Sequence, residues 1–594
     1  MISNIIPGLI MILTSFLLPT IPQYFRHPAM LLSVGLSALS LFNGYGTFLE
    51  WDVLGLNLIL YQSDSLTFPF SIIFHIAAVL VIIFSWHSKN LMEHMATLAY
   101  AGSAIGALHA GDFFSLFIWW EATALTSVFI VFAGNTKAAR DAAMRYLIIQ
   151  VSSGVLLLIG ACLLLYQTGN HNLTVLDLTT DFGIFIFIAF GIKAAFPFLN
   201  GWLQDSYPES SVTGTVALSA FTTKLAIYAL ARTFPGTDSL IWIGAIMTAF
   251  PVFFAVIEND LRRVLSFSLN NQLGFMVVGI GIGTELSLNG TVAHAFVHII
   301  YKALLFMSMG AVLYRAGTTK ASELGGLYKY MPFTTIFCII GAMSISAFPL
   351  FSGFVAKSLI MSSLGGMGMV LIYFVLFFAS AGVLEHSGIK IPYFAFFAHE
   401  RKSKVKEAPI NMLIAMGIAA VLCIGIGVFP KYLYQILPYT VEYQPYTIDH
   451  VISQLQLLVF AIIAFLFLVK FKLYPSEIRS TVLNSDWFYR KMIPGVLKPL
   501  IYSIQNLMSI TYNFLLESQS IISIGEYAGT ENKKVLIFNH KARSGQADNQ
   551  DYKSYLVRIA NIFDQCDFLY TNEEDIDSKL ILDNNLIHTP TIFG

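Results

Sequence analysis

The octapeptide AFPFLNGW at residues 195–202 recurs as AFPLFSGF at residues 347–354. Each copy carries a proline at its third position and a glycine at its seventh, and residues so placed interrupt a helix. Non-helical backbone at membrane depth persists only where protein or water binds its free amide groups, so a matched pair of breaks indicates a transport route. The predicted breaks lie at Pro197, Gly201, Pro349 and Gly353. Two unrelated proline kinks remain the alternative, because membrane helices tolerate proline.

The composition around these repeats is that of a membrane protein. Of 594 residues, 56% are hydrophobic and 12% are charged, whereas a soluble chain carries about 25% charged residues. The formal net charge of -1 gives no reason to expect a nucleic-acid partner. The four cysteines form no CxxC pair, so we expect no disulfide, no metal cluster and no cofactor.

About fifteen apolar runs are long enough to span a bilayer, which takes about 20 residues. The predicted spans are residues 2–20, 28–44, 65–85, 93–111, 113–133, 141–167, 182–203, 211–232, 238–257, 264–284, 288–314, 333–363, 367–390, 411–430 and 452–472. The two octapeptides fall five spans apart and therefore cross the membrane in opposite directions, as inverted repeats do. We predict an all-α membrane protein of about 14–15 transmembrane helices with two inverted five-helix repeats, each containing a broken helix.

Basic residues gather in alternate predicted loops. Lys and Arg resist translocation, so the loops rich in them stay in the cytoplasm. The basic set comprises Arg26, Lys89, Lys137, Arg140, Arg145, Arg262, Arg263, Arg315, Lys320, Lys329, Arg401, Lys402, Lys404 and Lys406. The opposite loops offer little beyond Arg232 and Lys431. We expect a multi-pass protein of the bacterial inner (plasma) membrane, and this asymmetry predicts that its N-terminus lies outside and its C-terminal tail in the cytoplasm.

The predicted domain organisation follows from these spans. The N-terminal run has no basic start, so we expect a retained first helix rather than a signal peptide. The predicted regions are 1–90, N-terminal transmembrane helices; 91–235, first repeat; 236–400, second repeat; 401–475, C-terminal transmembrane helices; 476–524, an interfacial amphipathic region; and 525–594, a polar cytoplasmic tail. The interfacial anchor is predicted at Trp487, Phe488, Tyr489, Arg490 and Lys491.

Seven ionisable residues lie well inside predicted spans. They are Glu121, Lys193, Lys224, His294, His298, Lys302 and Lys357. A Lys or an acidic residue at mid-bilayer opposes insertion by about 2.5–3.5 kcal/mol unless it is paired or hydrated, so an intramembrane charge indicates function by default. A buried Glu and Lys can pass protons by exchanging neighbours, because burial disfavours a charge and an opposite charge restores it. We predict that the seven form a proton pathway.

Structural explanations for these residues remain open. Glu121 could be a single satisfied carboxyl, and Lys193 could extend to the interface. His294, His298 and Lys302 recur every four residues, which places them on one helix face over about 12 Å. Two histidines so spaced could bind a metal, but no carboxylate accompanies them and HExxH is absent. They could also be core histidines bonded to backbone.

A second charged group ends the thirteenth predicted span. Glu385, His386 and Lys390 lie close to its cytoplasmic end. We expect these three side chains to be mainly interfacial, with a proton exit as the alternative.

Several longer motifs resemble one family, the antiporter-like subunits shared by Mrp-type sodium/proton antiporters and the membrane arm of respiratory complex I. The motifs are WWEATAL at 119–125, GIKAAFPFLNGWLQDSYPES at 191–210, FTTKLAIYAL at 221–230, NDLRRVLSFSLNNQLGFM at 259–276, HAFVHIIYKALLFM at 294–307, ELGGLYKYMP at 323–332 and FSGFVAKSLI at 351–360. The stretch at 379–397 looks most like the D-type subunits of the Mrp antiporters. Asn200 departs from the family, whose members often carry histidine near that position.

The resemblance implies a central hydrophilic axis. The family's fifth-helix glutamate, the lysines of its seventh and eighth helices, the histidines and lysine of its eleventh and the charged residue of its broken twelfth match the seven residues above. It implies a proton-translocating subunit of a multisubunit monovalent cation (Na+)/H+ antiporter, a transporter rather than an enzyme, whose partners are other membrane subunits, protons, Na+ and lipid. A proton-pumping membrane subunit of an NADH-quinone oxidoreductase-like or hydrogenase-like respiratory complex is the alternative. A structural scaffold is disfavoured, because apolar packing would serve it without buried charges.

Overall fold

The computed structural model describes residues 5–53, 55–398, 404–474, 487 and 491–520. The predicted polar tail at 525–594 lies outside these residues, as do Phe488, Tyr489 and Arg490 of the predicted anchor. Helix α21 (Ile493–Ser520) belongs to a separate unit and falls within the predicted region 476–524.

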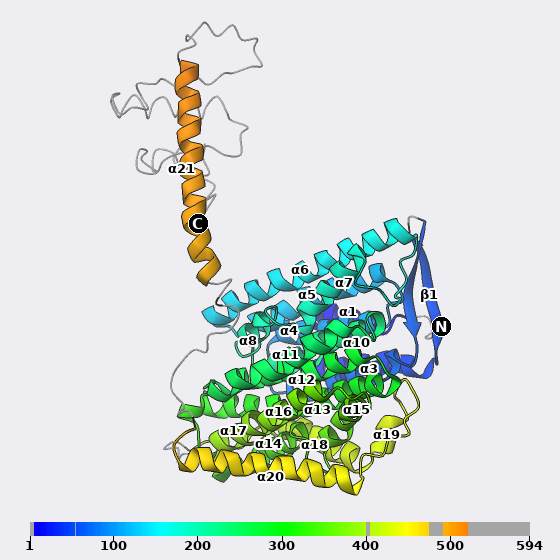
Figure 1. The fold of residues 1–594 in the computed structure, drawn as a ribbon, viewed down its shortest axis with the longest axis vertical. Coiled ribbons are helices and arrows are strands. Elements are labelled where there is room, and N and C mark those ends of the chain that lie inside the picture. The colour runs from blue at the N-terminus through cyan, green and yellow to red at the C-terminus, as the bar shows by residue number, and fades with distance from the viewer. Residues whose placement is uncertain (1–4, 54, 399–403, 475–486, 488–490, 521–594) are drawn as a thin grey trace, which may run out of the picture. The chain divides into compact units, whose positions relative to one another are not determined.

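The first three helices flank a β-hairpin that the span prediction did not include. The helices are α1 (Leu9–Leu17), α2 (Gln23–Ala38) and α3 (Thr67–Phe84), with short 3-10 turns η2 (Leu18–Thr20) and η3 (Leu39–Phe42). Strands β1 (Gly46–Val53) and β2 (Leu56–Ser63) pair antiparallel, and Gly55 between them has a φ of 81°. The hairpin stands across one end of the helices (Figure 1).

Hydrogen bonds fix this hairpin to the connection between the fourth and fifth spans. Ile59 N donates to Asp112 Oδ2 at 2.7 Å, and Gln62 N donates to His109 O at 2.8 Å. Asp112 also accepts from Ser115 N at 2.8 Å and so caps the next helix. One carboxylate therefore joins the hairpin to the helix that begins at Phe113.

Two sets of helices follow, each containing one interrupted span. The first set is α4 (Leu91–Leu108), α5 (Phe113–Phe132), α6 (Lys137–Thr168), α7 (Asp181–Ala194) with α8 (Gly201–Ser206), and α9 (Gly214–Ala220) with α10 (Thr222–Thr233). The second set is α11 (Asp238–Ile257), α12 (Leu261–Ile282), α13 (Glu285–Ala316), α14 (Pro332–Ile345) with α15 (Ser352–Gly366), and α16 (Val370–Val383) with η6 (Leu384–Ile389), α17 (Lys390–Pro392) and η7 (Tyr393–Phe397). The connection before α14 contains η4 (Ala321–Glu323) and η5 (Leu327–Lys329). This is the predicted all-α fold with two five-helix repeats.

The remaining helices complete the membrane unit. They are α18 (Ile410–Val428), α19 (Pro430–Tyr434) and α20 (Ile448–Lys470). Among the described residues, 11 helices are long and apolar enough to cross a membrane. The other four predicted spans correspond to α1, α4 and the interrupted pairs α7–α8 and α14–α15. The predicted count of spans therefore agrees with the helices observed.

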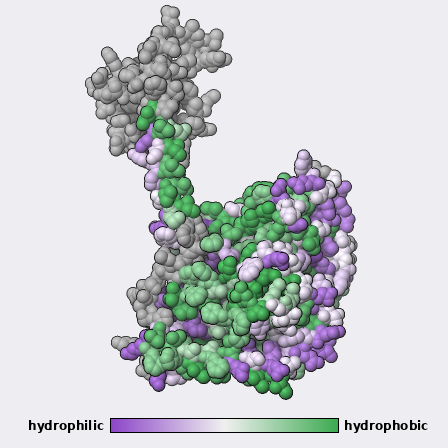
Figure 2. Space-filling model, viewed as in Figure 1, coloured by the Kyte–Doolittle hydropathy of each residue, from purple (hydrophilic) through white to green (hydrophobic). Residues whose placement is uncertain are grey.

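Polar residues are concentrated inside this bundle and apolar residues cover its outside. Helices α10 and α12 are buried along their length, and α13 nearly so. Outer helices instead expose large apolar side chains, such as Phe250 in α11, Val421 in α18 and Phe460 in α20. Figure 2 shows an apolar surface over the helices, with hydrophilic residues gathered along the end that carries the hairpin. Lipid-facing helices are expected to be apolar in this way.

The two sequence repeats adopt the same backbone conformation at both breaks. Ala195 and Ala347, the first residues of the octapeptides, have φ of 61° and 57°. Phe198 and Leu350, the fourth residues, have φ of 68° and 74°. A non-glycine residue in this left-handed region costs roughly 1–2 kcal/mol. Two unrelated kinks would not share both positions, so the repeat is structural.

Matching hydrogen bonds close the helix before each break. Phe196 N donates to Gly191 O at 2.9 Å, and Phe348 N donates to Met343 O at 3.1 Å. Both are six-to-one bonds of the kind that ends a helix at a left-handed residue. The prolines then prevent the helix from resuming, because they supply no amide donor.

Gly353 is expected to be irreplaceable at the second break. A Cβ at this position would overlap Ser344 O, which is backbone and cannot move aside. We expect Gly353→Ala to destabilise the protein by about 1–3 kcal/mol. The measurement is the midpoint of thermal unfolding of the purified protein. Gly425→Ala is the control, because a Cβ there meets nothing within 4 Å; equal midpoints for the two variants would contradict this packing.

Asp64 is expected to stabilise the fold in a pH-dependent way. Its Oδ1 accepts from Thr67 N at 2.8 Å at the start of α3, and its Oδ2 lies 2.7 Å from Arg232 Nη2 of α10. Burial opposes the charge of Asp64, but Arg232 and these hydrogen bonds hold its pKa below the usual value. A lowered pKa in the folded state stabilises the protein above the unfolded-state pKa, about 3.9, and this stability is lost as the pH falls through the folded-state pKa.

Asp64→Asn should therefore lower the free energy of unfolding at neutral pH by about 0.5–2 kcal/mol. Its difference from the wild type should shrink below about pH 4, where the wild-type carboxylate also takes up a proton. Unfolding midpoints across this pH range provide the measurement. A difference that stays constant with pH would rule out the ion pair as its source.

Candidate functional site

Glu121 and Lys193 lie close together on neighbouring helices, but within the described chain they form no ion pair. Lys193 is fully buried, and its Nζ donates to Trp120 O at 2.6 Å and to Thr123 Oγ1 at 2.9 Å. These partners flank Glu121 in α5, so the two charges interact across a short distance. The Glu121 carboxylate packs against Gly154 of α6, where a Cβ would overlap Oε1. That Oε1 is buried and lacks a hydrogen-bond partner among the described residues.

Lys224 follows a third interruption, between α9 and α10, that the sequence did not reveal. Its side chain is fully buried, and Nζ donates to Ser219 O at 2.6 Å and to Thr223 Oγ1 at 3.2 Å. Ser219 lies in the last turn of α9, where a helix leaves carbonyl oxygens without an amide partner. A lysine is well suited to such a position, because an ammonium satisfies these carbonyls and favours the negative end of the helix dipole.

The two histidines of α13 lie on one face but differ in their hydrogen bonding. His294 Nε2 lies 3.2 Å from Gln272 Oε1 and 3.0 Å from Tyr301 OH. His298 is fully buried, and neither of its ring nitrogens has a hydrogen-bond partner in the part of the chain that is described. The two rings are 6.0 Å apart, centroid to centroid. A core histidine bonded to backbone therefore does not describe His298.

Lys302 and Lys357 both bind backbone carbonyls near these histidines. Lys302 Nζ donates to Leu265 O of α12 at 3.0 Å. Lys357 Nζ donates at 2.8 Å to Ile345 O, the carbonyl of the last residue of α14, directly before the second break. Lys357 also lies 5.1 Å from the ring of Phe275, which contacts His294 at 5.9 Å. Phe275 thus lies between His294 and Lys357, the lysine that binds the helix end at the second break.

The structure gathers the seven predicted residues into two groups. Five are buried around α12 and α13 and lie within electrostatic range of one another: Lys224, His294, His298, Lys302 and Lys357. Glu121 and Lys193 form the other group between α5 and α7. No hydrogen bond or ion pair among the described residues joins Lys193 to Lys224. Protons crossing between the groups would need water or side-chain motion.

The breaks themselves lie beside these groups. Lys193 precedes Pro197 and Gly201, and Lys357 follows Pro349 and Gly353. Among the described residues, no group of three or more His, Cys, Asp and Glu side chains could hold a metal ion. The arrangement can bind, orient and hand on protons at nitrogen and carboxylate atoms.

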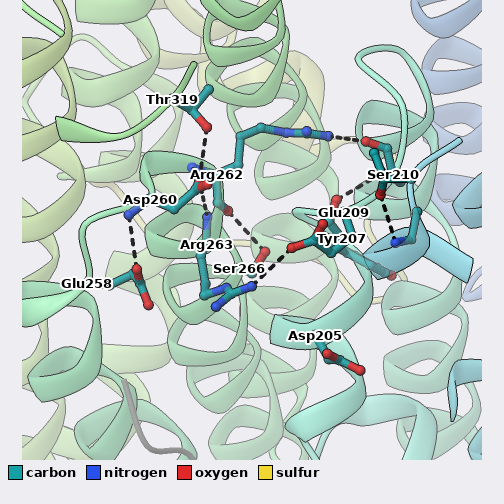
Figure 3. Close-up of polar contacts among 12 residues, drawn as sticks. Asp205, Tyr207, Glu209, Ser210, Glu258, Asp260, Arg262, Arg263, Ser266 and Thr319 are labelled. Carbon is teal, nitrogen blue, oxygen red and sulfur yellow. Dashed lines mark hydrogen bonds and ion pairs between the residues drawn. The ribbon is translucent and has the colours of Figure 1, made fainter. Parts of the chain in front are cut away.

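A network of charged and polar residues joins the loop after α8 in the first repeat to the start of α12 in the second (Figure 3). Arg145 of α6 binds Asp205 in two bonds of 2.7 and 3.0 Å, and Arg263 Nη2 lies 3.3 Å from Glu209. Arg262 donates to two carbonyls of the loop after α8 at 2.9 Å each. Burial raises the pKa of Glu209, although Arg263 partly offsets this effect.

The structure buries His386 and Lys390, which were expected to be mainly interfacial, inside the protein. His386 is 0% exposed and Lys390 is 2% exposed. The helix that carries them changes to π-helical geometry at Leu384, and this wider turn directs both residues toward α11 and α12. Burial of this kind cannot be read from hydropathy, because position along a span does not fix the face that a residue occupies.

Polar residues that were not predicted from the sequence bind several members of the predicted set. Gln272 and Tyr301 bind His294, Thr123 binds Lys193, and Ser219 binds Lys224. The sequence pattern does point to two of these residues, Gln272 and Tyr301. Gln272 ends the polar run Asn270-Asn271-Gln272 inside an apolar span, and Tyr301 follows His294 by two helical turns.

The fold and site together define a class: a polytopic membrane protein whose core helices enclose amines and imidazoles beside two matched helix breaks. The profile of the NADH:quinone oxidoreductase/Mrp antiporter transmembrane family matches residues 110–384. The chain is also 30% identical over 358 residues to the D-type Na+/H+ antiporter subunit of Alkalihalophilus pseudofirmus, covering 56% of this chain and 72% of that relative. The chain belongs to the NADH:quinone oxidoreductase/Mrp antiporter family.

Other relatives come from respiratory complexes. Hydrogenase-4 component B of Escherichia coli is 26% identical, with 56% of this chain and 56% of the relative covered. The N-type NADH-quinone oxidoreductase subunit of Desulforudis audaxviator is 30% identical, with 44% and 56% covered. The fold matches a chain of the Mrp complex from a Dietzia species at a TM-score of 0.71 and 21% identity, covering 89% of this chain and 64% of that one. It also matches a chain of respiratory complex I from Thermus thermophilus at a TM-score of 0.63 and 18% identity, covering 73% and 99%.

Proposed function

We propose that this chain is the proton-translocating subunit of a multisubunit monovalent cation (Na+)/H+ antiporter. The observation that carries the proposal is the enclosed group of Lys224, His294, His298, Lys302 and Lys357, whose amines and imidazoles lie within electrostatic range of one another. Each lysine at the centre of a span opposes membrane insertion by roughly 2.5–3.5 kcal/mol, a cost that packing alone gives no reason to retain. Similarity to a D-type Na+/H+ antiporter subunit supports the same assignment.

Proton transfer in this proposal uses the lysines as charge carriers and His298 as the link between them. Each lysine Nζ rests on a carbonyl oxygen, which accepts a hydrogen bond from both the protonated and the neutral amine. A proton can therefore leave Lys302 or Lys224 without leaving the carbonyl unpaired. His298 has two ring nitrogens without partners in the described chain, so it can accept a proton at one and release a proton from the other.

We propose that Glu121 and Lys193 form a second proton-binding group on the route. Lys193 lies before the first break and Lys357 after the second, so each repeat would place one amine beside its break, in opposite halves of the route. Because amines and imidazoles bind protons whereas Na+ prefers oxygen ligands, we assign proton transfer to this chain and cation exchange to the assembled complex.

A second candidate is a proton-pumping membrane subunit of a respiratory complex. It is favoured by the similarity to hydrogenase-4 component B and to the N-type NADH-quinone oxidoreductase subunit. Purification of the native complex discriminates between the two. Small multi-span antiporter subunits and Na+-dependent proton flux support the antiporter, whereas iron–sulfur or quinone-binding subunits support the respiratory complex.

Within the antiporter, we propose the orientation and regions predicted from sequence, with two repeats at 91–235 and 236–400, the N-terminus outside and the bacterial inner membrane as the location. The charged loop network around Arg262 and Arg263 would then face the cytoplasm, and the hairpin would face outward.

This orientation predicts the labelling of single cysteines introduced into a chain whose native cysteines are replaced. Trp51→Cys, in the exposed hairpin, should react with a membrane-impermeant maleimide in intact spheroplasts. Lys320→Cys, on the exposed loop before η4, should react only after the membrane is opened. The reverse pattern would contradict the orientation.

Removal of single axis residues should stop proton movement without preventing assembly. We expect Glu121→Ala, Lys224→Ala and Lys357→Ala each to lower cation-dependent proton flux by roughly tenfold or more, because each removes a proton-binding group. The measurement uses inverted vesicles with a pH-sensitive dye and quantifies the assembled complex. Lys431→Ala, a lysine in α19 outside the enclosed group, is the matched control. Normal flux in all three variants would refute the pathway.

A further inference from the structure

A second set of buried polar groups leads away from Lys302 and is not used by the proposed axis. It lies where α16 passes into the π-helical segment η6. Its members are His386, Lys390 and Glu258, which are 0%, 2% and 3% exposed. π-helical turns inside α-helices are often found at functional sites, because the wider turn displaces side chains from the regular helix face.

His386 is held one turn of α12 away from the carbonyl that binds Lys302. Its Nδ1 lies 2.8 Å from Ser387 Oγ, which donates to Ser268 Oγ of α12 at 2.8 Å. Lys302 binds Leu265 O, three residues before Ser268. The imidazole is within electrostatic range of both Lys302 and Lys390. Its Nε2 is buried and has no hydrogen-bond partner among the residues described.

Lys390 follows His386 by four residues and reaches the end of α11. Its Nζ donates to Ala255 O at 3.1 Å, Val256 O at 2.5 Å and Glu258 O at 2.7 Å. In a purely structural role, Lys390 would cap the last carbonyls of this helix. Helix capping by Lys390 would not explain why His386, one helical turn earlier, is also buried and lies within electrostatic range of Lys302.

Glu258 connects this set to the charged loops of Figure 3. Its Oε1 accepts from Asn259 N at 2.8 Å and Asp260 N at 3.0 Å. Its Oε2 is buried and finds no partner in the described part of the chain. Asp260 in turn accepts from Arg263 N at 3.3 Å and from Thr319 Oγ1 at 3.0 Å. Burial raises the pKa of Glu258, so its carboxyl takes up a proton more readily than an exposed one.

We propose that Glu258, Lys390 and His386 form a side branch of the proton pathway, which joins Lys302 to the loop face that carries Arg262 and Arg263. This inference rests on the proposed function, since it adds an access route to the same axis. Each group takes up one proton and passes one on, from the Glu258 carboxyl to the Lys390 amine, to His386 Nε2 and then to Lys302. The branch returns to its starting state after each transfer.

The test compares three variants in the complete complex in vesicles. His386→Gln keeps a polar side chain of similar size but cannot bind a proton, and it should lower proton flux by roughly tenfold or more. Lys224→Ala, on the central axis, is measured in parallel. His75→Gln is the matched control, because this buried histidine has partners for both ring nitrogens, Ser71 O at 2.7 Å and Ser37 Oγ at 3.0 Å.

The outcomes separate the branch from the proposed function. Loss of flux in His386→Gln and Lys224→Ala, with flux retained in His75→Gln, supports the branch. Normal flux in His386→Gln with loss in Lys224→Ala overturns the branch alone. Normal flux in Lys224→Ala instead removes support from the proposed function. Equal loss in His75→Gln and His386→Gln would indicate a packing role and also overturn the branch.

A second variant keeps the proposal testable if His386→Gln fails to assemble. Glu258→Gln retains an oxygen for the amides of Asn259 and Asp260 but cannot carry a proton. It should reproduce the loss of flux while the complex assembles and melts as the wild type does. Full flux in Glu258→Gln would overturn the branch.

Discussion

Each of the five buried lysines in the described membrane unit donates to a backbone carbonyl oxygen, and the rest of the site depends on this contact. The lysines are Lys193, Lys224, Lys302, Lys357 and Lys390. A buried amine without an oxygen partner would be prohibitively costly, and so would a buried carbonyl without a donor. Three of the lysines bind the last turn of a helix, where such carbonyls are available. Helix ends and lysines therefore stabilise one another inside the bundle.

The two breaks share the same backbone angles because each must end a helix inside the bundle. Ala195 and Ala347 must both enter the left-handed region to end a helix at membrane depth. The repeats then use their amines differently. Lys193 reaches back to α5 from before its break, whereas Lys357 binds Ile345 O across its own break. The same helix break thus occurs twice in the bundle, and the lysine near each copy binds a different helix.

Much of this arrangement could be predicted from sequence, and the failures have physical causes. Proline, glycine and long apolar runs act locally, so the breaks at Pro197 and Pro349 and the spans were predicted correctly. The hairpin at 46–63 was missed because it is too polar for a span and depends on distant partners such as Asp112. The partners of Lys193, a carbonyl and a threonine, were not predicted because charge alone does not show which uncharged groups surround an amine. The burial of His386 was not predicted, because a π-helical turn sets the helix face on which it lies.

If this chain carries protons, water must join the buried amines and imidazoles into a continuous route. The most direct measurement is a cryo-EM map of the native complex at a resolution that shows ordered water. We predict water bridging the nitrogens of His298 to Lys302 on one side and to Lys224 on the other. A dry, close-packed His298, with only apolar atoms between it and both lysines, would contradict this route.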